Sequence, residues 1–411
     1  MKNLVENFFR HEYGHLVAVL TQKVGLSHIH DVEDAVQNAL IKALETWAQN
    51  GTPDKPHAWL YKVANNNILG ILRQNNTRSE ILKKNQDITD SITKEEIETV
   101  LTSEFKEGIL KWLFICCHPS IAIDSQIVFA LKTLCGFSIK EISIRLFITE
   151  TNAYKRYSRA RTYLKNHSNN LPQLKQNDHC LRLPAVNKVL YLIFTEGYLS
   201  SHLQYSIRSE MCEEAIRLSS ILVDSPMGKT PETFALLALM HLHISRLPAR
   251  VNNANELLLL EQQDRSLWDQ NHIQHGLYWL SQASVGDELS RYHAEAGIAI
   301  EHCLAASFEQ TNWDKIIKCY ELLEKTTPSA LHQLNKVVAI AQLQGAEAGL
   351  TELYKQKPPE WLLESYQFHA VISDLNRRCG KQKKADISAQ RAINLAPTPA
   401  IKKSLETRLK S

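Results

Sequence analysis

The pentapeptide HEYGH, residues 11–15, has the residue types and spacing of a zinc site. In the H-E-x-x-H pattern, His11 and His15 would bind zinc from adjacent helical turns, and Glu12 would activate a water molecule. Glu33 is available downstream as a third ligand. The ten residues before His11 do not supply the sheet on which such zinc sites normally rest. We therefore expect an amphipathic first helix, with the histidines on or near its surface and no metal.

Cys116, Cys117 and His118 form a second group of metal-ligand residue types. Three consecutive helical side chains point in different directions, so they cannot all reach one metal ion. We expect these residues to serve packing. The eight cysteines are scattered without C-x-x-C spacing and are expected to be reduced thiols. No cofactor and no enzymatic activity are predicted.

Apolar residues recur at intervals of three and four along most of the chain, which predicts an all-α protein. The 411 residues, 44% of them hydrophobic, suffice for two or three domains. The predicted divisions are a helical domain over 1–78, a polar linker over 79–104, a second helical domain over 105–168 and an array of helical hairpins over 169–411. Neither a secretion signal nor a membrane-spanning run is visible, so a cytoplasmic protein without membrane contact is expected.

Residues 137–166 predict a helix-turn-helix. A first segment, residues 138–146, places Ile139, Ile142 and Leu146 on one face. A second segment begins at Thr149 or Thr151, either of which can cap it, and buries a stripe at helical spacing. That stripe consists of Ala153, Tyr157, Ala160 and Leu164. The opposite face carries donors suited to base edges and phosphates in a major groove: Asn152, Lys155, Arg156, Arg159 and Arg161.

Two further amphipathic helices precede this motif. DVEDAVQNALIKALETW, residues 31–47, has an apolar face and an opposite polar face of Asp31, Glu33, Asp34, Gln37 and Asn38. AWLYKVANNNILGILRQ, residues 58–74, forms the next helix after a loop containing Gly51 and Pro56.

Taken in order, these three motifs resemble bacterial RNA polymerase sigma factors of the extracytoplasmic-function type. That family has a D-x-E-D-x-x-Q helix, a W-L-x-x-(I/V)-A-x-N helix, a linker and an E-I-A-x-x-L helix-turn-helix that ends in R-A-R. The likeness covers residues 1–168. The stretches FICCHPSI, LPAVNKVLYLIFTEGY, ALLALMHLHISRLPAR and LLEQQDRSLWDQ resemble the subgroup that carries a long tetratricopeptide-like C-terminal extension.

The resemblance implies a partner for each motif. The acidic helix would dock on the clamp helices of the largest subunit of core RNA polymerase, through Asp31, Glu33, Asp34 and Gln37. The next helix and the loop before it would open promoter DNA at its −10 element, with Lys62, Asn65, Asn66 and Arg73 on bases or phosphates. The helix-turn-helix would read the −35 element: Asn152, Lys155, Arg156 and Arg159 would contact bases, and Arg161 would contact phosphates.

Three positions depart from the family pattern. Asn65 replaces the usual Arg, and Gly70 replaces the usual Asp and weakens its helix by about 1 kcal/mol relative to Ala. The promoter-opening residues are therefore the least supported part of the resemblance. Phe147 replaces the usual turn Gly, so the turn must avoid a positive φ angle.

The long extension has the weakest functional signal. The segment GKQKKADISAQRAINLAP, with Ala385, Ala389 and Ala392, resembles the second helix of a tetratricopeptide hairpin. Such arrays form concave surfaces for partner proteins, and a regulatory role follows as a hypothesis. A ligand pocket for a protein or small molecule is one interpretation of the polar residues Glu196, Asp264, Arg265 and Trp268, and ion pairs that orient helices are the other.

Two other functions compete with the sigma factor reading. A one-component helix-turn-helix regulator with a helical sensor domain would bind a palindrome as a dimer, but it has no use for the acidic helix. A zinc hydrolase would require His11 and His15 to hold metal.

Overall fold

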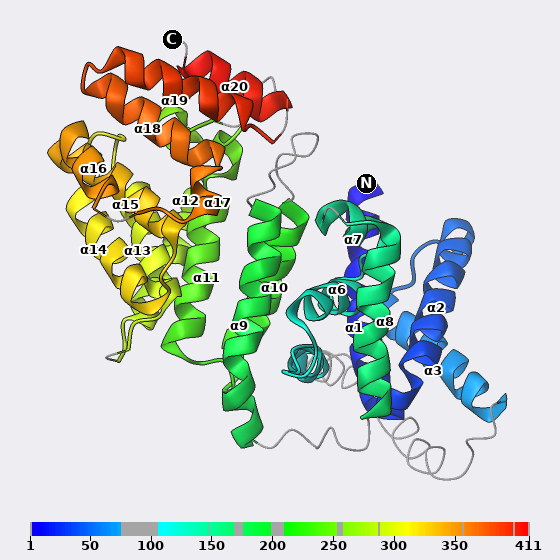
Figure 1. Ribbon diagram of the computed structural model, residues 1–411. Coiled ribbons are helices and arrows are strands. Elements are labelled where there is room, and N and C mark those ends of the chain that lie inside the picture. Colours follow the sequence, from blue (N-terminus) through cyan, green and yellow to red (C-terminus); the bar gives the residue numbers. More distant parts are fainter. Residues whose placement is uncertain are drawn as a thin grey trace. The chain divides into compact units, whose positions relative to one another are not determined.

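The computed structural model consists of α-helices and short 3₁₀ helices, and no strand occurs among the residues that it describes (Figure 1). The described residues are 2–74, 106–146, 148–167, 176–198, 209–252, 258–286, 288–355, 357–397 and 399–409. The all-α prediction is confirmed. The predicted linker, 79–104, and Phe147 in the predicted turn lie outside the described residues.

The chain divides into two compact units, each with its own set of packed helices. Unit 1 comprises residues 1–193 and 224–227, and unit 2 comprises residues 194–223 and 228–411. Helix α9 (Gln176–Tyr198) runs from the first unit into the second.

Unit 1 begins with three helices around one apolar core. They are α1 (Lys2–Val24), α2 (Ile29–Asn50) and α3 (Pro56–Gln74), and the short η1 (Leu26–His28) joins the first two. Gly51 ends α2 with a φ of 77°, and its amide donates to the Trp47 carbonyl. Pro56 then opens α3, a position where its fixed φ and missing amide hydrogen carry no penalty. The shared core includes Leu16, Leu20, Val36, Ala39, Leu60 and Ile68, all fully buried.

Four more helical segments complete the described part of unit 1 before α9. They are residues 106–116, α6 (Ile123–Thr133), α7 (Ile139–Leu146) and α8 (Glu150–Asn166). Cys116 and Cys117 are fully buried, and the Cys116 thiol lies 3.8 Å from the Thr133 hydroxyl. The packing role expected for them is therefore confirmed, and all eight cysteines are free thiols.

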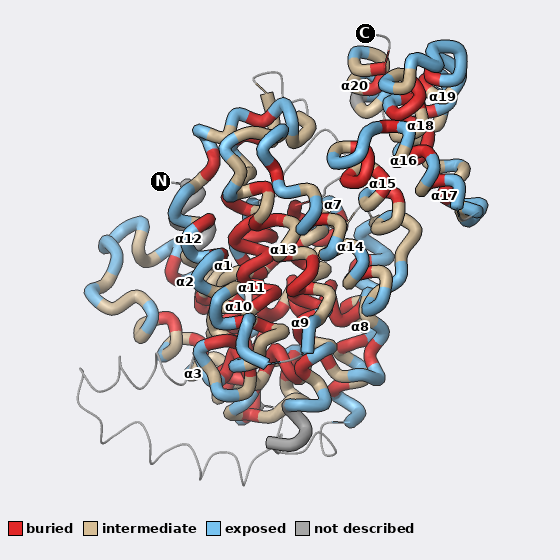
Figure 2. Tube along the Cα trace, turned by 90° about the vertical axis from the view of Figure 1, so that its left-hand side faces the viewer, coloured by how far each residue is buried: buried red, intermediate tan, exposed pale blue. Residues whose placement is uncertain are grey.

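Unit 2 is a succession of helices in which chain neighbours pack on each other. The helices are α10 (Ser209–Asp224), α11 (Pro231–Ile244), α12 (Gln270–Ala283), α13 (Arg291–Leu304), α14 (Trp313–Thr326), α15 (Ala330–Gln344), α16 (Ala346–Leu353), α17 (Glu360–Leu363), α18 (Tyr366–Arg378), α19 (Gln382–Asn394) and α20 (Pro399–Leu409). Short 3₁₀ turns, η2 (Leu247–Ala249), η3 (Leu260–Gln262) and η4 (Arg265–Leu267), connect α11 to α12. Figure 2 shows buried residues along α11 and α13.

The last hairpin of unit 2 follows the pattern expected from its small residues. Helices α18 and α19 pack closely. Ala385, Ala389 and Ala392 are buried residues of α19. The Ser373 hydroxyl donates to the Ala385 carbonyl at 2.9 Å and joins α18 to α19. None of the described helices is both long enough and apolar enough to cross a membrane.

Candidate nucleic-acid interface

Helices α7 and α8 are each capped by side chains of their own sequence. In α7, the Ser138 amide donates to Glu141 at 2.7 Å and the Glu141 amide donates to the Ser138 hydroxyl at 3.1 Å, which is a capping box. In α8, the Thr149 hydroxyl accepts from the Asn152 amide at 3.2 Å. The cap was expected at Thr149 or Thr151, and the structure places it at Thr149. The S-x-x-E spacing of the α7 box was visible in the sequence and was overlooked.

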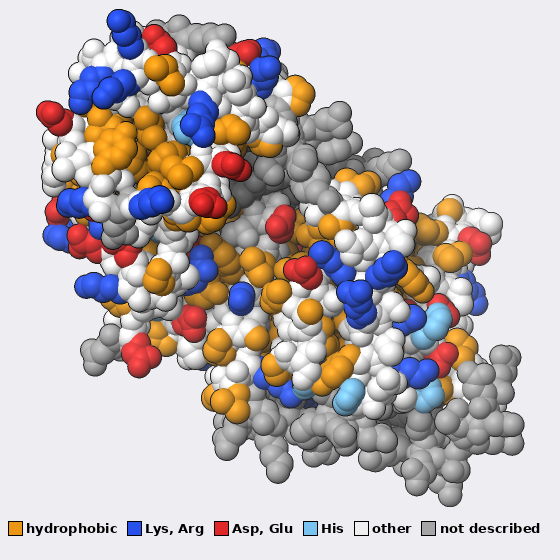
Figure 3. All heavy atoms as spheres, in the orientation of Figure 1, with side chains coloured by type: hydrophobic (Ala, Val, Ile, Leu, Met, Phe, Trp, Pro, Cys, Tyr) orange, Lys and Arg blue, Asp and Glu red, His pale blue; other side chains and the backbone are white. Residues whose placement is uncertain are grey.

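Helix α8 buries the apolar stripe expected for it and exposes a basic face. Ala153, Tyr157, Ala160 and Leu164 are its buried residues. Of the predicted base contacts, Asn152, Lys155 and Arg159 are exposed. Figure 3 shows Lys and Arg side chains gathered over α7 and α8.

The other two arginines of this face are engaged within the protein. The Arg156 guanidinium lies 3.1 Å from the Asp124 carboxylate at the start of α6, and Arg161 stacks on the Tyr157 ring at 5.4 Å. Asp124 is 60% exposed, so this ion pair is worth at most about 1 kcal/mol and can yield to a phosphate or a base.

The acidic face of α2 is narrower than its pattern predicts. Asp34, Gln37 and Asn38 are exposed, and Asp31 is half-buried with its carboxylate 3.2 Å from His28 Nδ1. Glu33 was expected on the outer face, but it is only 5% exposed. The periodicity places Glu33 on the polar face of α2, as expected. It is buried because a segment distant in sequence covers that part of the face.

The cover over Glu33 is a hydrogen-bonded network from three other helices. Tyr13 of α1 donates its hydroxyl to Glu33 Oε1 at 3.0 Å, and Tyr157 of α8 donates to Glu33 Oε2. Lys132 of α6 donates to the Tyr13 hydroxyl at 3.0 Å. Burial, with the Glu33 charge, raises the pKa of both tyrosines well above the usual range, so they remain protonated donors. A buried carboxylate is tolerated because it is hydrogen-bonded in this way.

The polar residues expected to act on the −10 element lie along α3. Lys62, Asn66 and Arg73 are exposed. Asn65 is half-buried, and its side-chain oxygen accepts from Lys23 of α1 at 3.2 Å. Gly70 has open space around it, so no close approach explains the missing side chain.

The HEYGH residues form an internal polar contact. Glu12 is buried, and its Oε1 lies 2.8 Å from His57 Nδ1 and 3.4 Å from His15 Nδ1. Burial raises the pKa of Glu12, but hydrogen bonds and charges from His15 and then His57 outweigh that effect and lower it. His15 and His57 therefore both face the Glu12 carboxylate. In a zinc hydrolase, the glutamate would instead face a water between the two ligands.

The four residues singled out in the extension do not act as one group. Arg265 donates to the Ala305 carbonyl at 2.7 Å, just beyond α13, and stacks on the Trp268 ring at 4.7 Å. Asp264 caps η4 by accepting from the Ser266 amide at 2.9 Å, and Glu196 is exposed on α9. The hydrogen bonds that Arg265 donates go to backbone carbonyls, and the ligand-pocket and ion-pair interpretations stay predictions.

Two segments of the chain match known protein families. Residues 8–78 match Sigma-70 region 2, and residues 182–284 match a family of unknown function (DUF6596). An uncharacterized protein of Rhizobium meliloti is 31% identical over 366 residues, which cover 89% of this chain and 86% of that protein. The Sigma-70 region 2 at its N-terminus indicates that the chain belongs to a sigma factor family.

The region 2 match covers most of α1 and all of α2 and α3. This assignment supports a role for the sigma factor in binding RNA polymerase and initiating transcription. No solved structure matches the chain.

Proposed function

We propose that this sigma factor, of the extracytoplasmic-function type, binds core RNA polymerase and directs initiation at a defined promoter, and that its C-terminal helical domain modulates this activity. The observation that carries the proposal is the Sigma-70 region 2 match over residues 8–78. The capped α7 and α8 pair, with its exposed donors, supports a second DNA-binding element downstream.

Polymerase binding is assigned to α2. Its exposed residues, Asp34 and Gln37, with the half-buried Asp31, are suited to the basic clamp helices of the largest polymerase subunit. Glu33 contributes to this contact only if Tyr157 of α8 withdraws from it, because the carboxylate is otherwise buried.

Promoter DNA binding is assigned to α3 and α8. Lys62, Asn66 and Arg73 on α3 act at the −10 element, and Asn65 joins them when it leaves Lys23. On α8, Asn152, Lys155, Arg156 and Arg159 read the −35 element, while Arg161 binds phosphate.

Modulation is assigned to the tetratricopeptide-like hairpins of unit 2. They enclose a groove of about 660 Å³, a volume suited to a peptide segment or a small molecule. Its lining mixes aromatic, polar and charged residues, among them Trp313, Tyr320, Asn335, Asp374 and Arg408. A protein or small-molecule partner of this groove would adjust sigma activity without touching DNA.

The decisive experiment is transcription in vitro with core polymerase and the full-length protein, on a candidate promoter from upstream of its own gene. We expect a promoter-specific transcript that depends on the protein. The double variant Asp34→Ala with Gln37→Ala should weaken core polymerase binding about tenfold or more, because it removes the exposed contacts of α2.

Glu45→Ala is the matched control, since Glu45 is also exposed on α2 but lies outside the predicted contact set. Equal effects of the two variants would contradict the assigned face. If no specific transcript appears and the protein alone protects a palindrome, the one-component regulator replaces the sigma factor proposal.

A further inference from the structure

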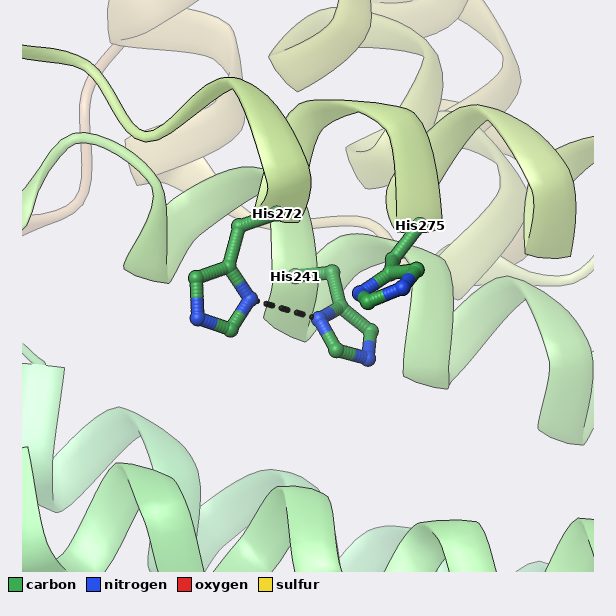
Figure 4. Close-up of side chains that lie close together, drawn as sticks. All are labelled: His241, His272 and His275. Carbon is green, nitrogen blue, oxygen red and sulfur yellow. Dashed lines mark hydrogen bonds between the residues drawn. The ribbon is translucent and has the colours of Figure 1, made fainter.

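Three histidines of unit 2 come together on one side of the α11–α12 pair. His241 belongs to α11, and His272 and His275 belong to α12, one helical turn apart. Figure 4 shows the His241 ring between the other two. One ligand nitrogen from each residue can be chosen so that all three lie within 4.8 Å of one another. We call these residues the histidine cluster.

The two helices are held at the close distance that the cluster requires. Gly276 packs directly on Leu242, because a Cβ at this glycine would lie 2.6 Å from the leucine side chain. At the start of α12, Asp269 accepts from the His272 amide at 3.1 Å, and the Asp269 amide donates to the Ser245 carbonyl at 2.9 Å. The backbone on both sides of the cluster is therefore fixed by contacts that do not involve the rings.

The ring geometry is near that of a metal site. His241 Nδ1 and His272 Nδ1 are 2.8 Å apart, and the His241 and His275 ring centroids are 5.2 Å apart. Zinc binds imidazole nitrogen at about 2.0–2.1 Å, which places two tetrahedral donors about 3.3 Å apart. Small rotations of the rings would bring three nitrogens to that spacing.

The electrostatic surroundings also favour a cation over protonated rings. Burial, followed by His272 and His275, lowers the pKa of His241 to about 3, so its ring is a neutral ligand. Burial lowers the pKa of His272, whereas the negative charges of Asp269 and Glu213 next to the cluster raise it. Three imidazoles beside carboxylates suit a divalent transition metal.

We propose that His241, His272 and His275 bind a divalent transition-metal ion, with zinc as the reference ion. The site lies within residues 182–284, and no role for these residues is implied by the proposed sigma function. Three imidazoles leave a fourth position for water or for another ligand. The bound ion joins α11 to α12, so metal occupancy stabilises this helix pair of the extension.

The test uses the full-length protein, stripped with chelator and titrated with Zn²⁺ by calorimetry. We expect one zinc per chain at a site that His275→Ala and His272→Asn each weaken at least about 100-fold, since each removes one of three ligands and loss of an outer-shell partner alone costs about 10–100-fold. His275 is exposed, so its substitution should leave the fold intact, and circular dichroism checks this. His30→Ala is the matched control, because this histidine is 65% exposed and lies on α2.

A thermal measurement gives an independent readout. Zinc should raise the Tm of the wild type and of His30→Ala, but not that of His275→Ala, because an ion bound to the folded state stabilises it by mass action. The absence of saturable zinc binding by the wild type would overturn the proposal. Equal zinc binding by His275→Ala and by the control would overturn it as well, whatever the outcome of the transcription experiment.

Discussion

Glu141 stabilises two helices at once. It closes the capping box of α7 with Ser138, and its Oε1 accepts from Arg10 of α1 at 3.2 Å. Burial raises the pKa of this carboxyl, but the hydrogen bonds from Ser138 and the charges of Arg10 and Arg145 outweigh burial and lower it. The Glu141 side chain thereby links α7 to α1.

This lowered pKa predicts a pH-dependent stability. Because the pKa is lower in the folded state, ionised Glu141 stabilises the fold above the unfolded pKa of about 4.3. That contribution is lost as the pH falls through the folded pKa. Glu141→Gln should therefore lower the free energy of unfolding by about 1 kcal/mol at pH 7, with the difference from wild type shrinking below about pH 4.

Urea unfolding at several pH values measures this effect. Glu45→Gln, an exposed change on α2, should stay within about 0.5 kcal/mol of wild type throughout. A loss for Glu141→Gln that remained constant down to pH 3 would show that its charge is not responsible.

At the scale of the element, α8 divides its residues between a buried packing face and an exposed basic face. Ala153, Tyr157, Ala160 and Leu164 hold the helix in place, while Asn152, Lys155 and Arg159 are exposed. Arg156 stands between these groups, because its guanidinium contacts Asp124 of α6 and is only partly exposed. The weak ion pair orients Arg156 without removing it from solvent.

The proposed role of α8 predicts that Arg156→Ala costs about 1–3 kcal/mol of binding free energy at the cognate −35 element and relaxes its sequence preference. Asp124→Asn is the informative companion: it removes the acidic partner and keeps the arginine, so affinity should be unchanged or higher. Holoenzyme binding to cognate and scrambled −35 sequences measures both variants. A uniform loss across all sequences for Arg156→Ala would make this residue a phosphate anchor.

At the scale of the molecule, the two predicted promoter-binding domains contact each other within unit 1. Helix α8 packs on η1, and α6 packs on α1. The contact is polar at its centre, where Tyr157, Tyr13 and Lys132 surround Glu33. In this arrangement the same interaction buries Glu33, an expected polymerase contact, and holds α8 in place.

This contact predicts a measurable contribution of Tyr157 to the stability of the fold. Tyr157→Phe removes one hydrogen bond to a buried carboxylate and should lower the free energy of unfolding by about 1–3 kcal/mol. Tyr154→Phe is the matched control on the same helix, since Tyr154 is 53% exposed. Denaturant unfolding followed by circular dichroism compares the two, and an equal response would show that the Glu33 network contributes no stability.

The sequence by itself determined the features that depend on local spacing. The helices, the buried stripe of α8 and the basic face opposite it follow from apolar residues at intervals of three and four. The small residues of α19 were recognisable for the same reason. The order of the three N-terminal motifs indicated a sigma factor because short patterns in a fixed order are specific even when each is weak alone.

Only the tertiary structure decided which polar side chains meet. Glu33 is buried by Tyr157, which is 124 positions away in the chain. Glu12 of α1 pairs with His57 of α3. His241 and His272 are 31 positions apart in the chain, so their spacing in the sequence does not predict that they are in contact. Periodicity specifies the face of a helix on which a residue lies, but the packing of distant helices decides what covers that face.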